Sequence, residues 1–280
     1  MVALEMRSLH RCFDGTQGFY QHASAVIGLP MRFSVYQPPQ AKHQRVPALF
    51  FLAGLTCTEE TFMIKAGAQR YAAKHGLMLV SMDTSPRQTG IAGETDDWDF
   101  GAGAGFYLDA IQTPWSQYYR MESYITQELR QIIINQFHAD QDRIGIFGHS
   151  MGGHGALTLT LRYPEIYRSV SAFAPICAPM QCPWGQKAFR NYLGENQKNW
   201  RQYDATALIE DGCRVPDLLI DQGFNDQFLT EQLQPHRLEN ACASTSQKLT
   251  LRYHQDYDHS YYFISSFIDD HLKYHREQLG

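Results

Sequence analysis

Short apolar runs alternate along this chain with longer segments in which apolar residues recur at helical spacing. Runs rich in Val, Ile, Leu and Phe that stop at Gly, Pro or polar residues predict strands. The predicted strands are Met31–Gln37, Ala48–Ala53, Met78–Asp83, Arg143–Phe147, Ser169–Ala174, Asp217–Gln222 and Lys248–His254. The predicted helices are Thr61–His75, Tyr118–Phe137, Gly152–Tyr163, Phe228–Cys242 and Tyr261–Gln278.

This alternation of strand and helix predicts an α/β fold, in which a mostly parallel central sheet is covered by helices on both faces. The first 40 residues have a different pattern, which indicates an antiparallel hairpin at one edge of the sheet. The sequence shows no internal repeat, no low-complexity tract and no long linker. We therefore expect residues 1–280 to form a single domain without a separate lid domain.

Composition narrows the class of protein. Hydrophobic residues make up 44% of the 280 residues, which is ample for a buried core, and the formal net charge is −5. That charge gives no general attraction for nucleic acid or for an anionic membrane, so we expect neither as a partner. The N-terminal segment carries charged residues where a signal peptide needs an apolar core. We interpret the chain as a cytoplasmic protein.

The cysteines are scattered and do not have the paired short spacing of a zinc site, so we expect no metal. A chain of this length can also bury enough surface to fold without disulfides. We therefore expect reduced thiols. The six cysteines are Cys12, Cys57, Cys177, Cys182, Cys213 and Cys242.

The strongest local signal for chemistry is Gly148-His149-Ser150-Met151-Gly152, which stands between a predicted strand and a predicted helix. A sharp turn from strand to helix would leave Ser150 at its apex, and the glycines on either side remove β-carbons that would collide there. The following helix N-terminus favours a developing oxyanion. In this context the pattern predicts the nucleophile of a serine hydrolase with the α/β-hydrolase fold, rather than a serine that stands in a glycine-rich turn by chance.

In this fold an acid and then a histidine follow the nucleophile along the chain, each in a loop after a later strand. Asp221 and Asp226 are both possible acids. We choose Asp226, because it lies past the strand end in the loop, and we expect Asp221 to be a structural carboxylate that caps loop N–H groups. His259 lies in the loop before the last predicted helix and is our choice of base, whereas His254 has the position of a half-buried packing residue.

The same fold needs two backbone N–H groups to stabilise the oxyanion. The residue after the nucleophile, Met151, is one expected donor. The second is expected after an early strand, where Phe50 to Thr58 runs from an apolar strand into Gly54. Gly54 permits a close backbone approach, and Leu55 is therefore the predicted second donor.

Several segments together resemble the S-formylglutathione hydrolases, also called the esterase D family, from about Phe33 to the C-terminus. Their number and order make coincidence implausible. The segments are Leu52-Ala53-Gly54-Leu55-Thr56-Cys57, Asp83-Thr84-Ser85-Pro86-Arg87, Trp98-Asp99-Phe100-Gly101, Gly103-Ala104-Gly105-Phe106-Tyr107, Gly148 to Leu157, Cys182-Pro183-Trp184-Gly185, Asp221-Gln222-Gly223, Asp226-Gln227-Phe228 and Tyr257 to Phe263.

The resemblance implies hydrolysis of S-formylglutathione to formate and glutathione, as a step of glutathione-dependent formaldehyde oxidation. It also implies side activity on short-chain esters, no cofactor and a homodimer. The family's triad falls on Ser150, Asp226 and His259. Ala53, where the family commonly has serine, and the loop Gln88-Thr89-Gly90 depart from the family pattern, and both bear at most on substrate fit.

The resemblance also draws attention to three residues near the expected site. Cys57 matches a family cysteine that lies close to the nucleophile and confers sensitivity to thiol reagents, although a small buried packing residue is the alternative. Trp184 could pack on glutathione and Lys187 could pair with one of its carboxylates. A structural tryptophan and a solvated lysine are the alternatives for these two.

Other functions remain to be separated from this one. Within enzymes the alternatives are a general short-chain carboxylesterase and an acyltransferase that passes the acyl group to a sugar or alcohol. A hydrolase fold kept as a non-catalytic binding module is a further alternative. Such modules typically lose triad members, whereas this sequence keeps all three candidates.

Overall fold

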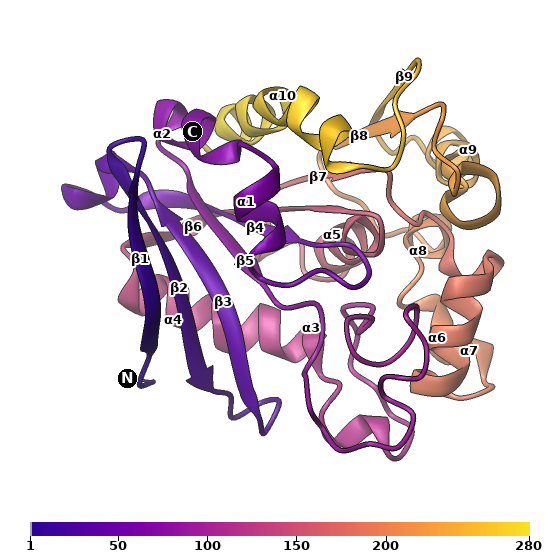
Figure 1. Ribbon diagram of the computed structural model, residues 1–280. Coiled ribbons are helices and arrows are strands. Elements are labelled where there is room, and N and C mark those ends of the chain that lie inside the picture. The colour runs from indigo at the N-terminus through magenta and orange to yellow at the C-terminus, as the bar shows by residue number, and fades with distance from the viewer. Residues whose placement is uncertain (1) are drawn as a thin grey trace.

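All nine strands belong to one twisted sheet (Figure 1). The computed structural model describes residues 2–280. The strand order is β1-β2-β3-β5-β4-β6-β7-β8-β9, with antiparallel pairing from β1 to β5 and parallel pairing from β5 to β9. The strands are β1 Glu5–Cys12, β2 Gly15–Ala23, β3 Pro30–Gln37, β4 Val46–Leu52, β5 Met78–Met82, β6 Ala139–His149, β7 Ser169–Phe173, β8 Leu218–Gly223 and β9 Leu249–His254.

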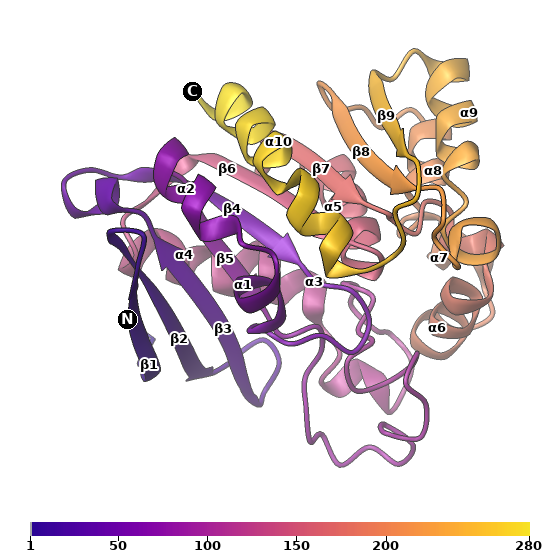
Figure 2. The same ribbon diagram turned by 45° about the horizontal axis from the view of Figure 1, so that its top comes forward.

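Helices cover both faces of this sheet. Figure 2 shows α2 and α10 in front of the central strands and α4 and α5 behind them. The α-helices are α1 Thr61–Lys65, α2 Ala68–His75, α3 Met121–Ser123, α4 Arg130–Gln136, α5 Met151–Arg162, α6 Pro183–Leu193, α7 Gln197–Arg201, α8 Ala205–Glu210, α9 Pro235–Thr245 and α10 Tyr261–Leu279. The short 3₁₀ and π segments are η1 Pro39–Lys42, η2 Trp115–Gln117, η3 Tyr124–Leu129, η4 Pro179–Gln181 and η5 Leu229–Leu233. The expected α/β-hydrolase architecture is confirmed.

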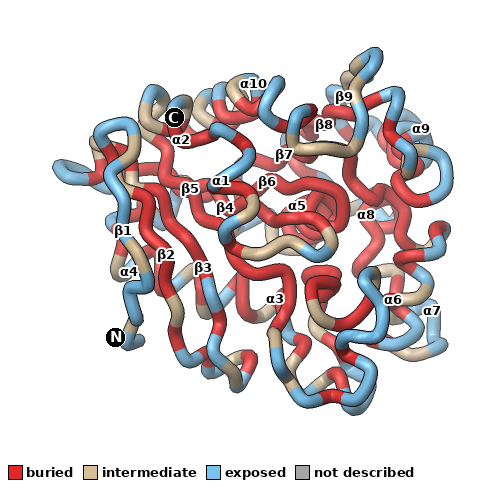
Figure 3. The backbone as a smooth tube through the Cα atoms, in the orientation of Figure 1, coloured by how far each residue is buried: buried red, intermediate tan, exposed pale blue. Residues whose placement is uncertain are grey.

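The central strands are buried on both faces, as a parallel sheet between two helical layers requires (Figure 3). Every residue of β4, β7 and β8 is buried, and so is α5 except for its last residue. By contrast, β1 is exposed at the sheet edge, except for its half-buried residues Ser8 and Cys12. Within residues 2–280, no helix is both long enough and apolar enough to cross a membrane.

The predicted strands are confirmed within a few residues, and the expected N-terminal hairpin is β1 and β2. Two predicted helices are each divided in two. Between α1 and α2, Gly67 adopts φ +65°, which breaks the helical path. Between η5 and α9, Gln234 adopts φ +47° before Pro235, a residue that disfavours helical conformation in the residue before it.

Candidate active site

Ser150 lies at the turn between β6 and α5 with φ +58° and ψ −120°, a backbone conformation that is strained for a residue other than glycine. Its N–H donates to the carbonyl of Phe173 on β7, and its own carbonyl accepts from His154 in α5. These hydrogen bonds hold the strained turn in place. The free N–H groups at the first turn of α5 surround the position at which negative charge would develop.

The turn is so tight that only glycine fits at Gly152. A β-carbon there would lie 1.9 Å from the carbonyl oxygen of Leu52 and 2.6 Å from that of Ala53. Both are backbone atoms at the end of β4, which cannot move aside without disrupting the sheet. The close packing therefore brings the β4 end, and the loop after it, against the nucleophile turn.

Asp226 and His259 meet beside this turn. His259 Nδ1 lies 2.5 Å from Asp226 Oδ2, and the Asp226 side chain is fully buried. The carboxylate also accepts from the backbone N–H of Phe228 and from the side chain of Gln222. With three donors in place, the carboxylate is fixed in orientation and holds the imidazole in the tautomer whose Nε2 can accept a proton.

His149 is a neighbour of both the candidate base and the candidate nucleophile. Its ring packs against that of His259 with the centroids 4.4 Å apart, and it directly precedes Ser150 in the chain. Burial lowers the pKa of His149 well below its usual value, and positive charge on His259 would lower it further. The neighbour of the base therefore stays neutral, which avoids a second charge beside an imidazolium.

Hydrogen bonds donated to its backbone carbonyl groups hold the loop that carries Leu55 in place. The Tyr107 hydroxyl donates to the Ala53 carbonyl at 2.7 Å, and Thr84 Oγ1 and Arg87 Nη2 donate to the Cys57 carbonyl at 2.7 and 3.0 Å. A β-carbon on Gly54 would lie 3.3 Å from the β-carbon of Ser150, so the loop passes directly beside the nucleophile. Within the described chain, the N–H groups of Leu55 and Met151 have no backbone or side-chain acceptor.

Cys57 is half-buried at the edge of this loop and faces the start of α10. Burial raises the pKa of its thiol, while hydrogen bonding to Thr61 and Tyr261 and the charges of Lys65 and Arg87 oppose that rise. Tyr261 is two residues after His259 in the chain. The thiol is therefore close to the candidate base but is not activated as a nucleophile.

The structure gives Lys187 partners that the sequence did not suggest. Its ammonium lies 2.6 Å from Asp99 Oδ1 and 2.9 Å from Asp97 Oδ2. Its charge is thus already neutralised within the chain. Trp184 is buried and packs between Trp98 and Phe228, at centroid distances of 5.5 and 4.8 Å.

Asp221 is a structural carboxylate, but our expectation that it caps loop N–H groups is wrong. It is fully buried and accepts two hydrogen bonds of 2.6 Å from Arg252, while His254 Nε2 lies 3.3 Å away. Burial alone would raise the pKa of Asp221, but His271 and Arg252 outweigh burial and hold that pKa below its usual range. The reason is that the end of β8 faces β9 and α10 rather than open loop backbone.

From Asp221 a series of polar contacts runs through α10 into the sheet. His271 Nε2 lies 3.3 Å from Asp221, His271 Nδ1 lies 2.8 Å from Ser171 Oγ, and His275 bridges Ser171 and Ser169 at 2.9 and 2.7 Å. A carboxylate only accepts, so it orients His271 with Nε2–H toward it. With both histidines neutral, each group then donates toward Asp221: Ser169 donates to His275, His275 to Ser171, and Ser171 to His271.

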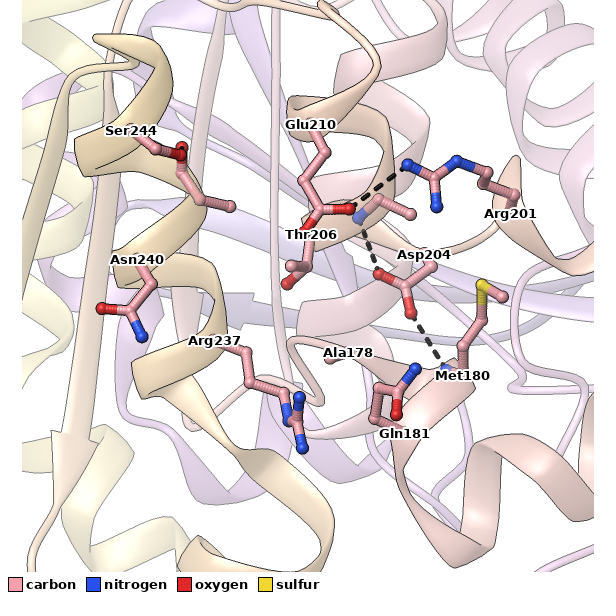
Figure 4. Close-up of a pocket in the computed structure, with 12 residues that line it drawn as sticks. Ala178, Met180, Gln181, Arg201, Asp204, Thr206, Glu210, Arg237, Asn240 and Ser244 are labelled. Atoms are coloured by element: carbon pink, nitrogen blue, oxygen red, sulfur yellow. Dashed lines mark hydrogen bonds and ion pairs between the residues drawn. The ribbon is translucent and has the colours of Figure 1, made fainter.

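A separate pocket of about 430 Å³ lies between η4, α8 and α9 (Figure 4). Its buried carboxylate, Asp204, caps α8 by accepting from Ala207 N–H and also accepts from Met180 N–H. Burial raises the pKa of Asp204 to about 6. Arg201, at the rim, is paired with Glu210. The polar groups therefore have structural roles, and no residue of the candidate triad lines this pocket.

Sequence reasoning assigned no role to Gln222, Tyr107, Phe228 or Trp98. The first two orient Asp226 and the Leu55 loop, and Phe228 packs edge-on against His259 at 5.0 Å. Within residues 2–280, no group of three or more His, Cys, Asp or Glu is arranged to hold a metal ion.

The chain is similar to known esterases over almost its whole length. The Esterase family model, described as "Putative esterase", matches residues 24–274. The S-formylglutathione hydrolase of Rattus norvegicus is 50% identical over the full length of both chains. That of Paracoccus denitrificans is 48% identical over 100% of this chain and 99% of its own. The solved S-formylglutathione hydrolase of Agrobacterium tumefaciens has a TM-score of 0.97 and 50% identity, covering 99% of this chain and 100% of its own.

Proposed function

The chain belongs to the S-formylglutathione hydrolase family, and on that premise we propose that it hydrolyses S-formylglutathione to formate and glutathione. It is a serine hydrolase with the α/β-hydrolase fold. The observation that carries the proposal is the buried contact between Asp226 and His259, placed beside the strained turn of Ser150. Full-length relatives with this activity in their names support the choice of substrate.

In the proposed reaction, Ser150 Oγ attacks the formyl carbonyl carbon while His259 Nε2 accepts the hydroxyl proton. Asp226 stabilises the imidazolium that forms. The N–H groups of Leu55 and Met151 stabilise the oxyanion, and their lack of other acceptors in the described chain fits this role.

The tetrahedral intermediate then collapses, the carbon–sulfur bond breaks, and the glutathione sulfur takes the proton from the His259 imidazolium as it leaves, so that the imidazole is again neutral. A thiol with a pKa of about 8.5 needs less help from a proton donor than an alcohol does. Water attacks the formyl-enzyme, His259 accepts a proton from it, and formate is released as the Ser150 hydroxyl is restored. Because the formyl group is very small, short acyl groups should react faster than long ones, which accounts for side activity on short-chain esters.

Steady-state kinetics on S-formylglutathione beside a short aryl ester test this proposal. We expect kcat/KM to favour the thioester, and Ser150→Ala to lower it by at least about 10⁴-fold while the circular dichroism spectrum is unchanged. A strong preference for the ester would instead indicate a general carboxylesterase. Failure of a fluorophosphonate probe to label the wild-type chain would indicate a non-catalytic fold.

We also infer the metabolic and cellular setting of the protein. A formyl thioester of glutathione forms when a hemithioacetal of formaldehyde is oxidised, so the activity would belong to formaldehyde detoxification. The six unpaired cysteines are compatible with the reducing cytoplasm. One sheet containing all nine strands supports a single domain.

A homodimer is a further proposal. Its support is the edge strand β1, which exposes Met6 and Leu9, with Phe13 exposed in the turn that follows. Sedimentation equilibrium of the wild-type chain tests it, and a monomer mass at micromolar concentration would contradict it.

A further inference from the structure

Aromatic side chains from three separate segments form a continuous series that starts at the candidate base. The ring of Phe228 contacts His259 at a centroid distance of 5.0 Å, Trp184 contacts Phe228 at 4.8 Å, and Trp98 contacts Trp184 at 5.5 Å. We call Phe228, Trp184 and Trp98 the aromatic wall. Its inner member Trp184 is buried, whereas its outer member Trp98 is 57% exposed.

The exposed ring of Trp98 offers a large, flat apolar surface that continues the buried rings of Trp184 and Phe228. Here the ring is also held in position. Asp97 and Asp99 flank Trp98 in the chain, and the ammonium of Lys187 in α6 bridges both carboxylates at 2.9 and 2.6 Å. The bridge attaches the Trp98 loop to α6 at two points. Trp98 is therefore presented to solvent by a fixed support.

The wall begins at an open cavity. A pocket of about 290 Å³ is lined by Phe228 and His259, together with Asn225, Gln227, Asp258 and Ser260. A substrate whose carbonyl lies beside His259 can therefore lie against Phe228, from which ring contacts lead through Trp184 to Trp98. Neighbouring ring centroids in this series lie about 5 Å apart, whereas one extended residue spans ~3.6 Å. The aromatic wall is therefore comparable in length with a tripeptide.

The chemistry decides which half of the substrate faces the wall. A formyl group has no carbon beyond the reacting carbonyl, so nothing on the acyl side could reach a wall of this length. Only the leaving group is long enough. Flat amide groups pack well on aromatic faces, and a peptide leaving group offers several of them.

We propose that Trp98, supported by Lys187, is a specificity-determining residue that packs on the peptide part of the leaving thiol. This inference rests on the proposed function for the identity of the substrate. Lys187 is a positioning residue that acts through Trp98 and does not itself pair with a substrate carboxylate. The enzyme thereby distinguishes a peptidyl thioester from a small thioester with the same acyl group.

The test compares two substrates that differ only in the leaving group, S-formylglutathione and the formyl thioester of 2-mercaptoethanol. Trp98→Ala should lower kcat/KM for S-formylglutathione about three- to ten-fold more than for the small thioester. Trp98→Phe should restore most of the difference. Lys187→Met should act in the same direction, mainly through KM, and Lys187→Arg should be close to wild type.

A control is Ile111→Ala, which removes an apolar side chain that is 54% exposed and belongs neither to the aromatic wall nor to the candidate site, and should leave both substrates unaffected. Equal losses on the two thioesters, or no loss on S-formylglutathione, would overturn the role of Trp98. A second readout is inhibition of small-thioester hydrolysis by S-methylglutathione, which should weaken by a similar factor in Trp98→Ala.

The inhibition readout separates this inference from the proposed function. A wild-type chain that does not hydrolyse S-formylglutathione, but is inhibited by S-methylglutathione in a Trp98-dependent manner, would overturn the proposed function and support the wall. Absence of inhibition, or inhibition that Trp98→Ala does not change, would overturn the proposed role of the aromatic wall in binding the leaving group.

Discussion

The imidazole of His259 and the carboxylate of Asp226 are joined by a 2.5 Å contact in which the carboxylate is completely shielded from water. Such shielding strengthens the electrostatic interaction, because water is not present to screen it. The contact also selects one of the two imidazole tautomers. The first prediction follows from this second effect.

Asp226→Asn should lower kcat by about 10⁴-fold, because an amide can donate to Nδ1 and stabilise the wrong tautomer of His259. Steady-state assays on S-formylglutathione measure the loss. Asp256→Asn is the control, since Asp256 is exposed in the turn after β9 and touches none of the candidate residues. A variant of Asp226 with more than a few per cent of wild-type kcat would contradict the assignment.

Gly152→Ala should destabilise the fold by more than about 3 kcal/mol, because the new β-carbon would lie 1.9 Å from a backbone oxygen of β4. Urea unfolding followed by circular dichroism provides the measurement. Gly67→Ala is the same substitution, but its β-carbon would meet no atom within 4 Å. It should therefore cost only the about 1–2 kcal/mol of placing alanine in a left-handed backbone conformation. Equal losses in the two variants would refute the steric argument.

Asp221→Asn should lower the free energy of unfolding by about 1.5–3 kcal/mol at pH 7, because the buried carboxylate loses its charge-assisted hydrogen bonds from Arg252, while Arg252 itself is partly exposed and keeps Asp270 as a partner. The pKa of Asp221 is depressed in the folded state, so its stabilisation is present above the unfolded pKa of about 3.9 and is lost as pH falls toward the folded pKa. The difference between variant and wild type should therefore shrink below about pH 4.

The control for this prediction is Asp211→Asn, which breaks an exposed ion pair with Arg201. Exposed pairs contribute about 1 kcal/mol or less, so this variant should be close to wild type at every pH. A loss in Asp221→Asn that does not change with pH would show that the ionised carboxylate is not what stabilises the fold.

Alkylation of Cys57 by iodoacetamide should block activity, and the reaction should be slow at pH 7 because burial raises the pKa of the thiol. The inactivation rate should rise about ten-fold per pH unit up to at least pH 9. Cys57→Ala should remain active and resist the reagent, whereas Cys213→Ser, at another partly exposed cysteine, should be inactivated as fast as wild type. Rapid inactivation at pH 7 would contradict a raised pKa.

The strands and the nucleophile turn could be predicted from sequence because their signals are local. Apolar runs such as Ala48–Ala53 are buried on both faces wherever the sheet places them, and Gly148 is required by the nearby backbone of Gly152, although the atoms that exclude a β-carbon at Gly152 itself lie at the end of β4. Asp226 could be preferred to Asp221 because it lies past the strand end, in the loop where this fold places the acid.

Relationships between distant side chains could not be predicted in this way. Nothing in the local pattern around Lys187 indicates that its partners lie on either side of Trp98. Likewise, the acceptor for Arg252 is an aspartate on the neighbouring strand, which depends on the register of β8 and β9. The break at Gly67 was missed because apolar spacing continues across it, and only the backbone angle shows it.

The series of hydroxyl and imidazole groups from Asp221 to Ser169 fixes the C-terminal helix, and this helix directly follows the loop that carries the proposed base. The proposed base stands two residues before α10, and that 19-residue helix is fastened to the sheet by His271 and His275 from its inner side. Truncation of the C-terminal half of α10 would remove His271 and His275. It would therefore loosen the position of His259, which stands before the other end of the helix.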